Sequence, residues 1–192
     1  MPDKNPAALD FLLSRRSRPA RTLGLPVPSQ DEVGQLLAAA TRVPDHGKLE
    51  PWRFIVLTRP ATDRLARLVE ERGPVLGQEP ERIAKAASQY SMSDLAVVVV
   101  QVPRPTEKVP LIEQTYSAGA VCLSLLNAAL AQGWGANWLS GWPTYDETFR
   151  REGLGLRDGE TVAGVIHIGT PVAESPDRPR PDVAKLTTWI SA

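Results

Sequence analysis

Residues 118–131 read AGAVCLSLLNAALA, an almost entirely apolar stretch interrupted by one glycine and two polar residues. With the residues before it, this stretch predicts one long helix over 112–132. A helix that is apolar on most sides cannot face water, so we expect it at the centre of the fold and also against a second copy of the chain. The small residues Gly119, Ala120 and Ala128 would allow close approach of another helix.

Shorter elements surround this helix on both sides. Two of the helices are expected to begin with a capping box, Ser29 with Glu32 and Thr144 with Glu147, which satisfies free backbone N–H groups. The first two strands, apolar in the first case and rich in valine in the second, are expected to be buried. Helices are expected at 6–13, after 29, at 61–72, at 81–89 and after 144, and strands at 54–57, 95–102, 136–139 and 162–168. This order lacks regular βαβ alternation, which favours the α+β class over a Rossmann layout.

Length and charge set broad limits on function. The chain has 192 residues with 22 basic and 22 acidic side chains, so its net charge of zero disfavours general binding to nucleic acid or to a membrane surface. We expect one domain over 1–192, in which the proline-rich, charged segment 171–192 is an extended C-terminal arm laid over a surface. No stretch is long and apolar enough to cross a bilayer, and we expect a cytoplasmic protein.

Metal and nucleophile chemistry find little support. The single cysteine, Cys122, lies inside the apolar helix, where a thiol is expected to be buried and inert, and it cannot form a multi-cysteine metal site. His167 alternates with isoleucines on a predicted strand and is expected to be structural. We therefore assign no catalytic side chain and no metal ligand.

The sharpest local signal is Arg15-Arg16-Ser17 at the end of the first helix. Two guanidinium groups and a hydroxyl can hold a phosphate through charge-assisted hydrogen bonds. The alternative is that the arginine pair only complements the helix macrodipole. Known phosphate loops are not present: there is no Walker sequence, and the Gly133-Trp134-Gly135 stretch lacks the third glycine of a dinucleotide-binding turn.

A second candidate is the proline-stiffened loop that carries Arg42, Asp45 and His46. Loops displayed by a rigid scaffold commonly bind ligands, but the same residues could simply form a turn. A Ser17–His46–Asp45 triad stays open, although the adjacent acid cannot easily orient its neighbour's ring. Trp134, Trp138 and Trp142 form a third group, which either packs in the core or faces a planar ligand.

Three of these segments together resemble the FMN-dependent nitroreductase family, most closely its compact bacterial subgroup. They are Arg15-Arg16-Ser17, the run from Arg42 to His46 with Pro51-Trp52, and the run from Gly133 through Trp138-Leu139-Ser140-Gly141. The resemblance covers roughly residues 6–171. It implies a nitroreductase-like α+β fold with a mostly antiparallel central sheet flanked by helices. It also implies a homodimer, with the long helix and two FMN molecules at the subunit interface.

The resemblance further implies residue roles. The FMN site would comprise Arg15, Arg16, Ser17, Arg42, His46, Trp138, Leu139 and Ser140, completed by the other subunit. The nicotinamide cofactor would contact Ala128, Ala129, Leu130, Ala131, Gln132 and Gly133. The segments Arg18-Pro19 and Gly47–Glu50 depart from the family pattern, which bears mainly on substrate contacts.

The activity implied is that of an oxidoreductase that passes hydride from NADH or NADPH through FMN to an electron-poor small molecule, such as a nitroaromatic, a quinone or an activated alkene. A flavin carries this chemistry itself, which agrees with the lack of a catalytic side chain. Two alternatives remain: a non-catalytic flavin-binding sensor or storage protein, and a flavin-dependent oxidative or dehalogenating enzyme.

Overall fold

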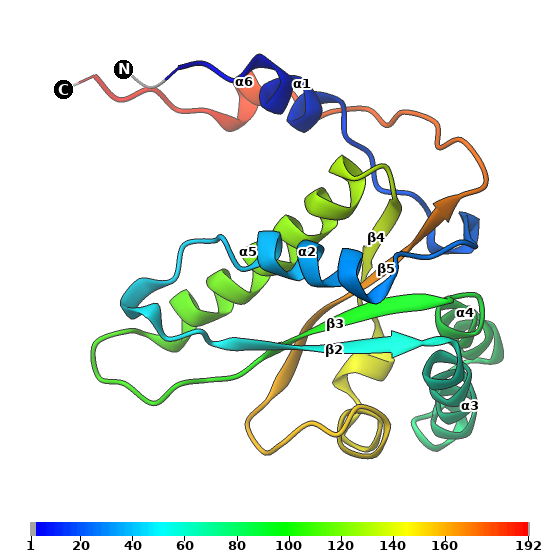
Figure 1. The fold of residues 1–192 in the computed structure, drawn as a ribbon. Helices are drawn as coiled ribbons and strands as arrows, with labels where there is room; N and C mark the ends of the chain where they lie inside the picture. The colour runs from blue at the N-terminus through cyan, green and yellow to red at the C-terminus, as the bar shows by residue number, and fades with distance from the viewer. Residues whose placement is uncertain (1–2, 192) are drawn as a thin grey trace.

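The computed structural model describes residues 3–191, which form helices around a five-stranded sheet (Figure 1). The helices are α1 (Pro6–Ser14), α2 (Gln30–Ala40), α3 (Arg59–Val75), α4 (Pro80–Ser91), α5 (Leu111–Ala131) and α6 (Val183–Leu186). The strands are β1 (Leu23–Gly24), β2 (Trp52–Thr58), β3 (Leu95–Gln101), β4 (Gly135–Leu139) and β5 (Thr161–Pro171). Short helical turns lie at Ala20–Thr22, His46–Lys48, Trp142–Tyr145 and Phe149–Gly153.

All paired strands of the sheet are antiparallel. The order is β1-β5-β3-β2, and β4 also pairs with the long strand β5. The first part of β5 lies beside β3, and its later part lies beside β4 and then β1. The predicted α+β class with an antiparallel central sheet is confirmed.

Helices cover both faces of this sheet, with α2 and α5 on one side and α3 and α4 on the other (Figure 1). Side chains alternate across a strand. Accordingly, Val97 and Val99 of β3 pack with α2 and α5, whereas Val98 and Val100 pack with α3 and α4. A strand covered on both faces is apolar at nearly every position, which explains the continuous valine run in this strand.

The expectation of full burial was wrong for the other strand, 54–57. It forms part of β2, which lies at the edge of the sheet and which the helices cover only in part. Leu57 is buried, but Val56 is 43% exposed. An apolar run therefore indicated the strand correctly but not its position at the edge.

The predicted capping boxes also had different outcomes. At α2 both reciprocal hydrogen bonds between Ser29 and Glu32 are present. The box predicted for Thr144 and Glu147 does not form, because the Thr144 hydroxyl donates to the carbonyl of Gly141 instead. The carboxylate of Asp146 accepts the Phe149 N–H at 3.0 Å and caps the following turn.

Helix α5 confirms the predicted long helix, and it packs along the sheet through residues such as Val121 and Leu125, which are fully buried. Its opposite face is open in the single chain. There Tyr116 is 68% and Leu123 is 46% exposed, and a Cβ added at Gly119 would meet no neighbour within 4 Å. The chain alone thus buries only one side of its most apolar helix.

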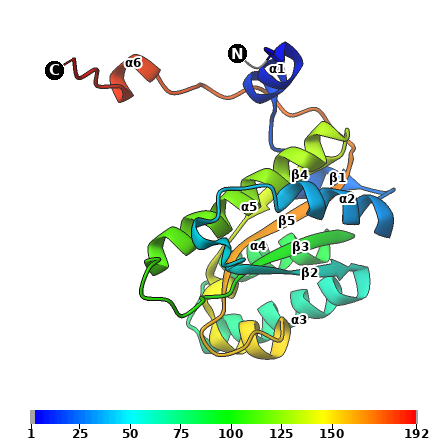
Figure 2. The same ribbon diagram turned by 60° about the vertical axis from the view of Figure 1, so that its left-hand side comes forward.

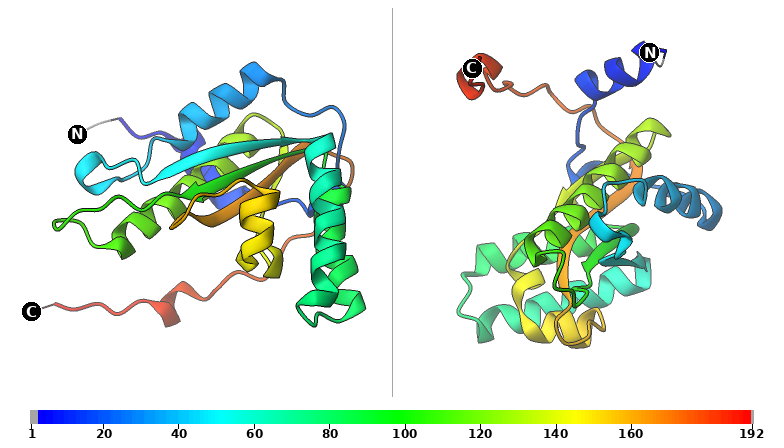
Figure 3. Two further views of the ribbon diagram at one scale, coloured as in Figure 1. Left: turned by 90° about the horizontal axis from the view of Figure 1, so that it is seen from below. Right: turned by 90° about the vertical axis from the view of Figure 1, so that its left-hand side faces the viewer.

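Beyond β5, residues 172–191 form an extended arm that includes α6 (Figure 2). The arm projects from the body on the same side as α1 and does not lie over the sheet or its helices, which corrects the expected placement (Figure 3, right). Its apolar side chains are largely exposed, with Leu186 at 75% and Trp189 at 91%, and so do little to hold it on the body. Among the helices that the structure describes, none is long and apolar enough to cross a lipid bilayer.

Candidate anion-binding site

A cavity of about 290 Å³ opens where the segment after α1 meets β4 and the C-terminal arm. We call it the cationic cavity, because four of its eight lining residues are arginines and none of the eight is acidic. The lining residues are Arg15, Arg16, Ser17, Pro19, Asn137, Trp138, Arg178 and Arg180. Two predicted segments, Arg15–Ser17 and the tryptophan segment, are therefore brought together.

Backbone contacts fix the segment after α1 in this place. The N–H of Arg15 donates to the carbonyl of Phe11 and closes the helix, after which Arg15 adopts an extended conformation. Three residues later, the N–H of Arg18 donates to the carbonyl of Ala136 at 2.9 Å. This bond fastens the segment to β4 and sets Ser17 beside the strand that carries Trp138.

Arg15 carries a charge that nothing in the described part of the chain neutralises. Its Nη2 donates to the Ser17 hydroxyl at 3.1 Å, while its Nε is buried without a hydrogen-bond partner. Burial lowers the pKa of Arg15, and the nearby charges of Arg180 and Arg16 lower it further. A guanidinium does not lose its proton under ordinary conditions, so this arrangement favours an incoming anion.

Sequence reasoning missed Arg178 and Arg180, which come from the arm. Arg16 joins the arm to the cavity: its guanidinium donates to the carboxylate of Asp177 and to the carbonyl of Pro176. These contacts span about 160 residues of sequence, so no local pattern could reveal them. The only hint was the alternation of arginine and proline at residues 178–181.

Of the tryptophans considered, Trp138 lies at the cavity and the others support the core. Trp134 and Trp142 pack against the two apolar clusters on opposite faces of the sheet. Trp138 is 37% exposed and lies against Gly164 of β5, where an added Cβ would be 2.1 Å from the indole Nε1. Leu139 ends β4, and Ser140 follows it on the surface.

The loop that carries Arg42 and His46 lies elsewhere. The Nδ1 atom of His46 is 2.6 Å from Oε2 of Glu113, in the first turn of α5, whereas β4 follows the other end of that helix. Arg42 is exposed. Asp45 accepts the backbone N–H groups of Leu49 and Glu50, so the Ser17–His46–Asp45 triad does not form within the chain.

The segment predicted to contact the nicotinamide cofactor, 128–133, covers the C-terminal end of α5. Ala129 is fully buried, Ala128 and Leu130 pack partly against the core, and Ala131, Gln132 and Gly133 are exposed. None of the six lines the cationic cavity. Their role stays a prediction.

Other reactive groups are buried in structural roles. Burial raises the pKa of the Cys122 thiol to about 12 and lowers that of His167 to about 4, and Nδ1 of His167 lies 2.8 Å from the Ser93 hydroxyl. Within residues 3–191, no cluster of three or more histidine, cysteine or acidic side chains could hold a metal ion.

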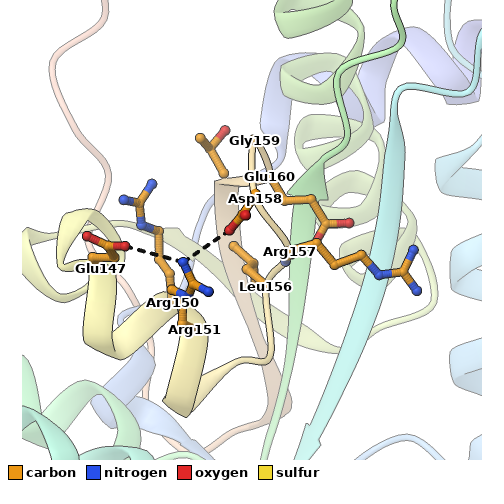
Figure 4. A pocket seen from close by; sticks show the side chains of 9 residues that line it. Glu147, Arg150, Arg151, Leu156, Arg157, Asp158, Gly159 and Glu160 are labelled. Carbon is orange, nitrogen blue, oxygen red and sulfur yellow. Dashed lines mark hydrogen bonds and ion pairs between the residues drawn. The ribbon is translucent and has the colours of Figure 1, made fainter.

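A second arginine-rich cavity, of about 200 Å³, lies by the turn before β5 (Figure 4). We call it the balanced cavity, because three arginines and three carboxylates line it: Arg150, Arg151, Arg157, Glu147, Asp158 and Glu160. Arg151 pairs with both Glu147 and Asp158. Glu160 accepts two hydrogen bonds from Arg53, at 2.8 and 2.7 Å, which hold its pKa down at about 2.

Comparison with known proteins agrees with the fold. Residues 12–170 match the model of the nitroreductase family. The Escherichia coli (strain K12) protein named "Putative NAD(P)H nitroreductase YdjA" is 34% identical over 85% of this chain and 88% of its own. Among solved structures, a nitroreductase-like family protein from Bacillus cereus has a TM-score of 0.78 at 23% identity over the whole of both chains. A Desulfovibrio desulfuricans structure, described as a "putative nitroreductase in complex with fmn", has a TM-score of 0.75 at 22% identity, covering 98% of this chain and 99% of its own.

Proposed function

The chain belongs to the nitroreductase family, and from this premise we propose that it is an FMN-dependent NAD(P)H oxidoreductase. A bound FMN would supply hydride transfer from NADH or NADPH to an electron-poor acceptor, so no side chain need act as nucleophile or base. The observation that carries the proposal is the buried, unpartnered Nε of Arg15 in a cavity lined by arginines and no acid. This donor set fits a phosphate dianion.

The residues of the cationic cavity would bind and orient the cofactor. Arg15 and Ser17 would hold the phosphate together with Arg178 and Arg180. Trp138, followed by Leu139 and Ser140, borders the same cavity and would shield the rest of the flavin from water. The protein's contribution is thus binding, orientation and electrostatic tuning, with the reaction left to the cofactor.

A second copy of the chain would complete the site. The cavity of about 290 Å³ is at the lower limit for small-molecule pockets, roughly 300–1,000 Å³, so one chain encloses only part of a flavin. Arg42 and His46 lie near the opposite end of α5, and we assign them to the flavin of the partner. The exposed apolar face of α5 around Tyr116 and Leu123 gives that partner a surface to cover.

The finer assignments form part of the same proposal. The nicotinamide cofactor would approach residues 128–133, and the acceptor would be a small electron-poor molecule such as a nitroaromatic, a quinone or an activated alkene. A cytoplasmic location suits a chain whose one cysteine is a buried free thiol.

The test compares FMN with riboflavin, which lacks the phosphate. Titration of the purified protein, followed by flavin fluorescence, should give an affinity for FMN that is roughly 100-fold higher or more, because two charge-assisted hydrogen bonds are gained. Equal affinities would contradict the phosphate role of the cavity. Stopped-flow mixing of the FMN complex with NADH and with NADPH should then bleach the flavin absorbance. A flavin that is bound but reduced by neither donor would favour the sensor or storage alternative.

A further inference from the structure

Two adjacent arginines of the cationic cavity, Arg15 and Arg16, have opposite surroundings. The side chain of Arg16 is 17% exposed, and both of its terminal nitrogens are engaged by the C-terminal arm. One donates to the carboxylate of Asp177, and the other donates to the carbonyl of Pro176. Arg15 instead keeps a buried Nε without a partner.

The contacts of Arg16 matter because little else in the same chain holds the arm. Within the described residues, the arm begins with a bond from the Val172 N–H to the Thr22 carbonyl at 2.9 Å. From residue 173 to residue 191, the hydrogen bonds found between the arm and the rest of the chain are the two made by Arg16. The arm otherwise projects into solvent (Figures 2 and 3).

Asp177 connects this contact to the two arginines that the arm supplies. Its carboxylate accepts the backbone N–H of Arg178 at 2.9 Å and lies 3.4 Å from a terminal nitrogen of Arg180. Arg178 and Arg180 both line the cationic cavity. A single carboxylate thus bonds to Arg16 on the body and fixes the part of the arm that faces the site.

We propose that Arg16 is a clamp for the C-terminal arm, which positions Arg178 and Arg180, while Arg15 and Ser17 contact the cofactor phosphate directly. This inference rests on the proposed FMN function. Arg16 is a positioning residue, and its contribution to phosphate binding passes through the arm. Because binding free energies are reciprocal, FMN should in turn hold the arm in place.

The clamp can be tested without flavin by a spin label on the arm. Cys122 is buried, so a cysteine introduced by Glu174→Cys can be labelled selectively. Arg16→Ala and Asp177→Asn should each sharpen the label's spectrum, because the arm gains mobility. Asp182→Asn is the matched control, since Asp182 pairs with Lys185 inside the arm and should leave the spectrum unchanged. An immobile label in Arg16→Ala would overturn the clamp.

The indirect role is tested by FMN affinity in a mutant cycle. Arg16→Ala should weaken FMN binding about as much as Arg178→Ala/Arg180→Ala, on the order of 10- to 100-fold, and the triple variant should be no weaker than that pair. Arg15→Ala should instead weaken binding further in every background. If Arg16→Ala weakens FMN binding as much in the Arg178→Ala/Arg180→Ala background as it does in the wild type, Arg16 contacts the phosphate itself.

Exchanging the two charges distinguishes loss of the Arg16–Asp177 pair from general misfolding of the variants. Arg16→Asp with Asp177→Arg should restore the immobile label that either change alone removes, whereas failure of the rescue would contradict a direct pairing. The two proposals fail separately. A wild-type chain that ignores FMN would overturn the cofactor role, while the label spectra would still decide whether Arg16 holds the arm.

Discussion

The balanced cavity and the cationic cavity are built from the same residue type and differ in what neutralises it. In the first, Arg151 pairs with Glu147 and Asp158, and Arg53 forms a two-bond pair with Glu160, whose side chain is only 3% exposed. Arg150 lines the same cavity beside these carboxylates, although its Nε is buried without a hydrogen-bond partner. In the second, four arginines line the space; Asp177, outside the lining, pairs with Arg16 and Arg180, whereas Arg15 has no carboxylate partner in the described part of the chain. The charges of the first cavity are met within the fold, whereas we propose that the unpaired charge of Arg15 is met by the cofactor phosphate.

The strongest test of this contrast makes the same substitution in both regions. Arg53→Ala leaves the buried Glu160 carboxylate without its partner and should lower the free energy of unfolding by about 3–5 kcal/mol. Arg15→Ala removes a charge that nearby arginines repel, so the flavin-free protein should stay within about 0.5 kcal/mol of wild type or become more stable. Urea unfolding at one protein concentration measures both, because dimerisation would otherwise shift the values.

A control clarifies the first of these losses. In Arg53→Ala/Glu160→Gln the bare carboxylate becomes a neutral amide, and part of the stability should return. If Arg15→Ala proved as destabilising as Arg53→Ala, the cationic cavity would be a structural feature, and the distinction between the two regions would be lost.

His167 extends the comparison to a third site. Like Arg15, it is a basic side chain with a buried nitrogen and without a carboxylate partner among the described residues, but unlike an arginine it can release its proton. Burial lowers its pKa from 6.5 to about 4. As the pH falls from 6.5 to 4, His167 is protonated in the unfolded chain but stays neutral in the folded chain. The free energy of unfolding that is present above pH 6.5 is therefore lost over this range. The loss should reach roughly 3 kcal/mol by pH 4.

The measurement for His167 is urea unfolding at several pH values between 7 and 4. His167→Asn keeps a side chain able to bond with the Ser93 hydroxyl, 2.8 Å away in the wild type, but it cannot take up the proton. Its stability should fall less steeply over this range. Glu160 loses its own contribution mainly at lower pH, because its pKa is about 2. Identical slopes in wild type and variant would argue against a neutral buried imidazole.

Much of the fold could be predicted because its signals are local. The apolar composition of 118–131 and the reciprocal pair Ser29–Glu32 each act within a few residues, and both predicted helices are present. The edge position of β2 depends on which strands pair across the whole chain, so an apolar run could not reveal it. Thr144 had two hydrogen-bonding choices at similar sequence distance, and the structure takes the one that the capping pattern did not predict.

The candidate site divides in the same way. Arg15 and Ser17 are close in sequence and could be predicted as a phosphate-binding pair, whereas Arg178 and Arg180 reach the cavity through a contact across about 160 residues. Sequence also left open whether Trp138 packs in the core or faces a ligand. Its place at the cavity depends on Gly164 of the neighbouring strand, a small residue whose purpose appears only once β4 and β5 are paired.

The pairing of β4 with β5 gives the smallest of the expected effects. A Cβ at position 164 would overlap the indole of Trp138, so Gly164→Ala should push the ring toward the cationic cavity and weaken FMN binding by about 10-fold. The loss of folding stability should be smaller than for Arg53→Ala, because the ring is partly exposed and can move. Gly34→Ala is the matched control, since α2 offers open space there and the helix should gain about 0.5–1 kcal/mol. Combining Gly164→Ala with Trp138→Ala should remove the additional loss, because no ring remains to be displaced. A Gly164→Ala protein that binds FMN as wild type does would mean that the position of Trp138 has no bearing on the cationic cavity.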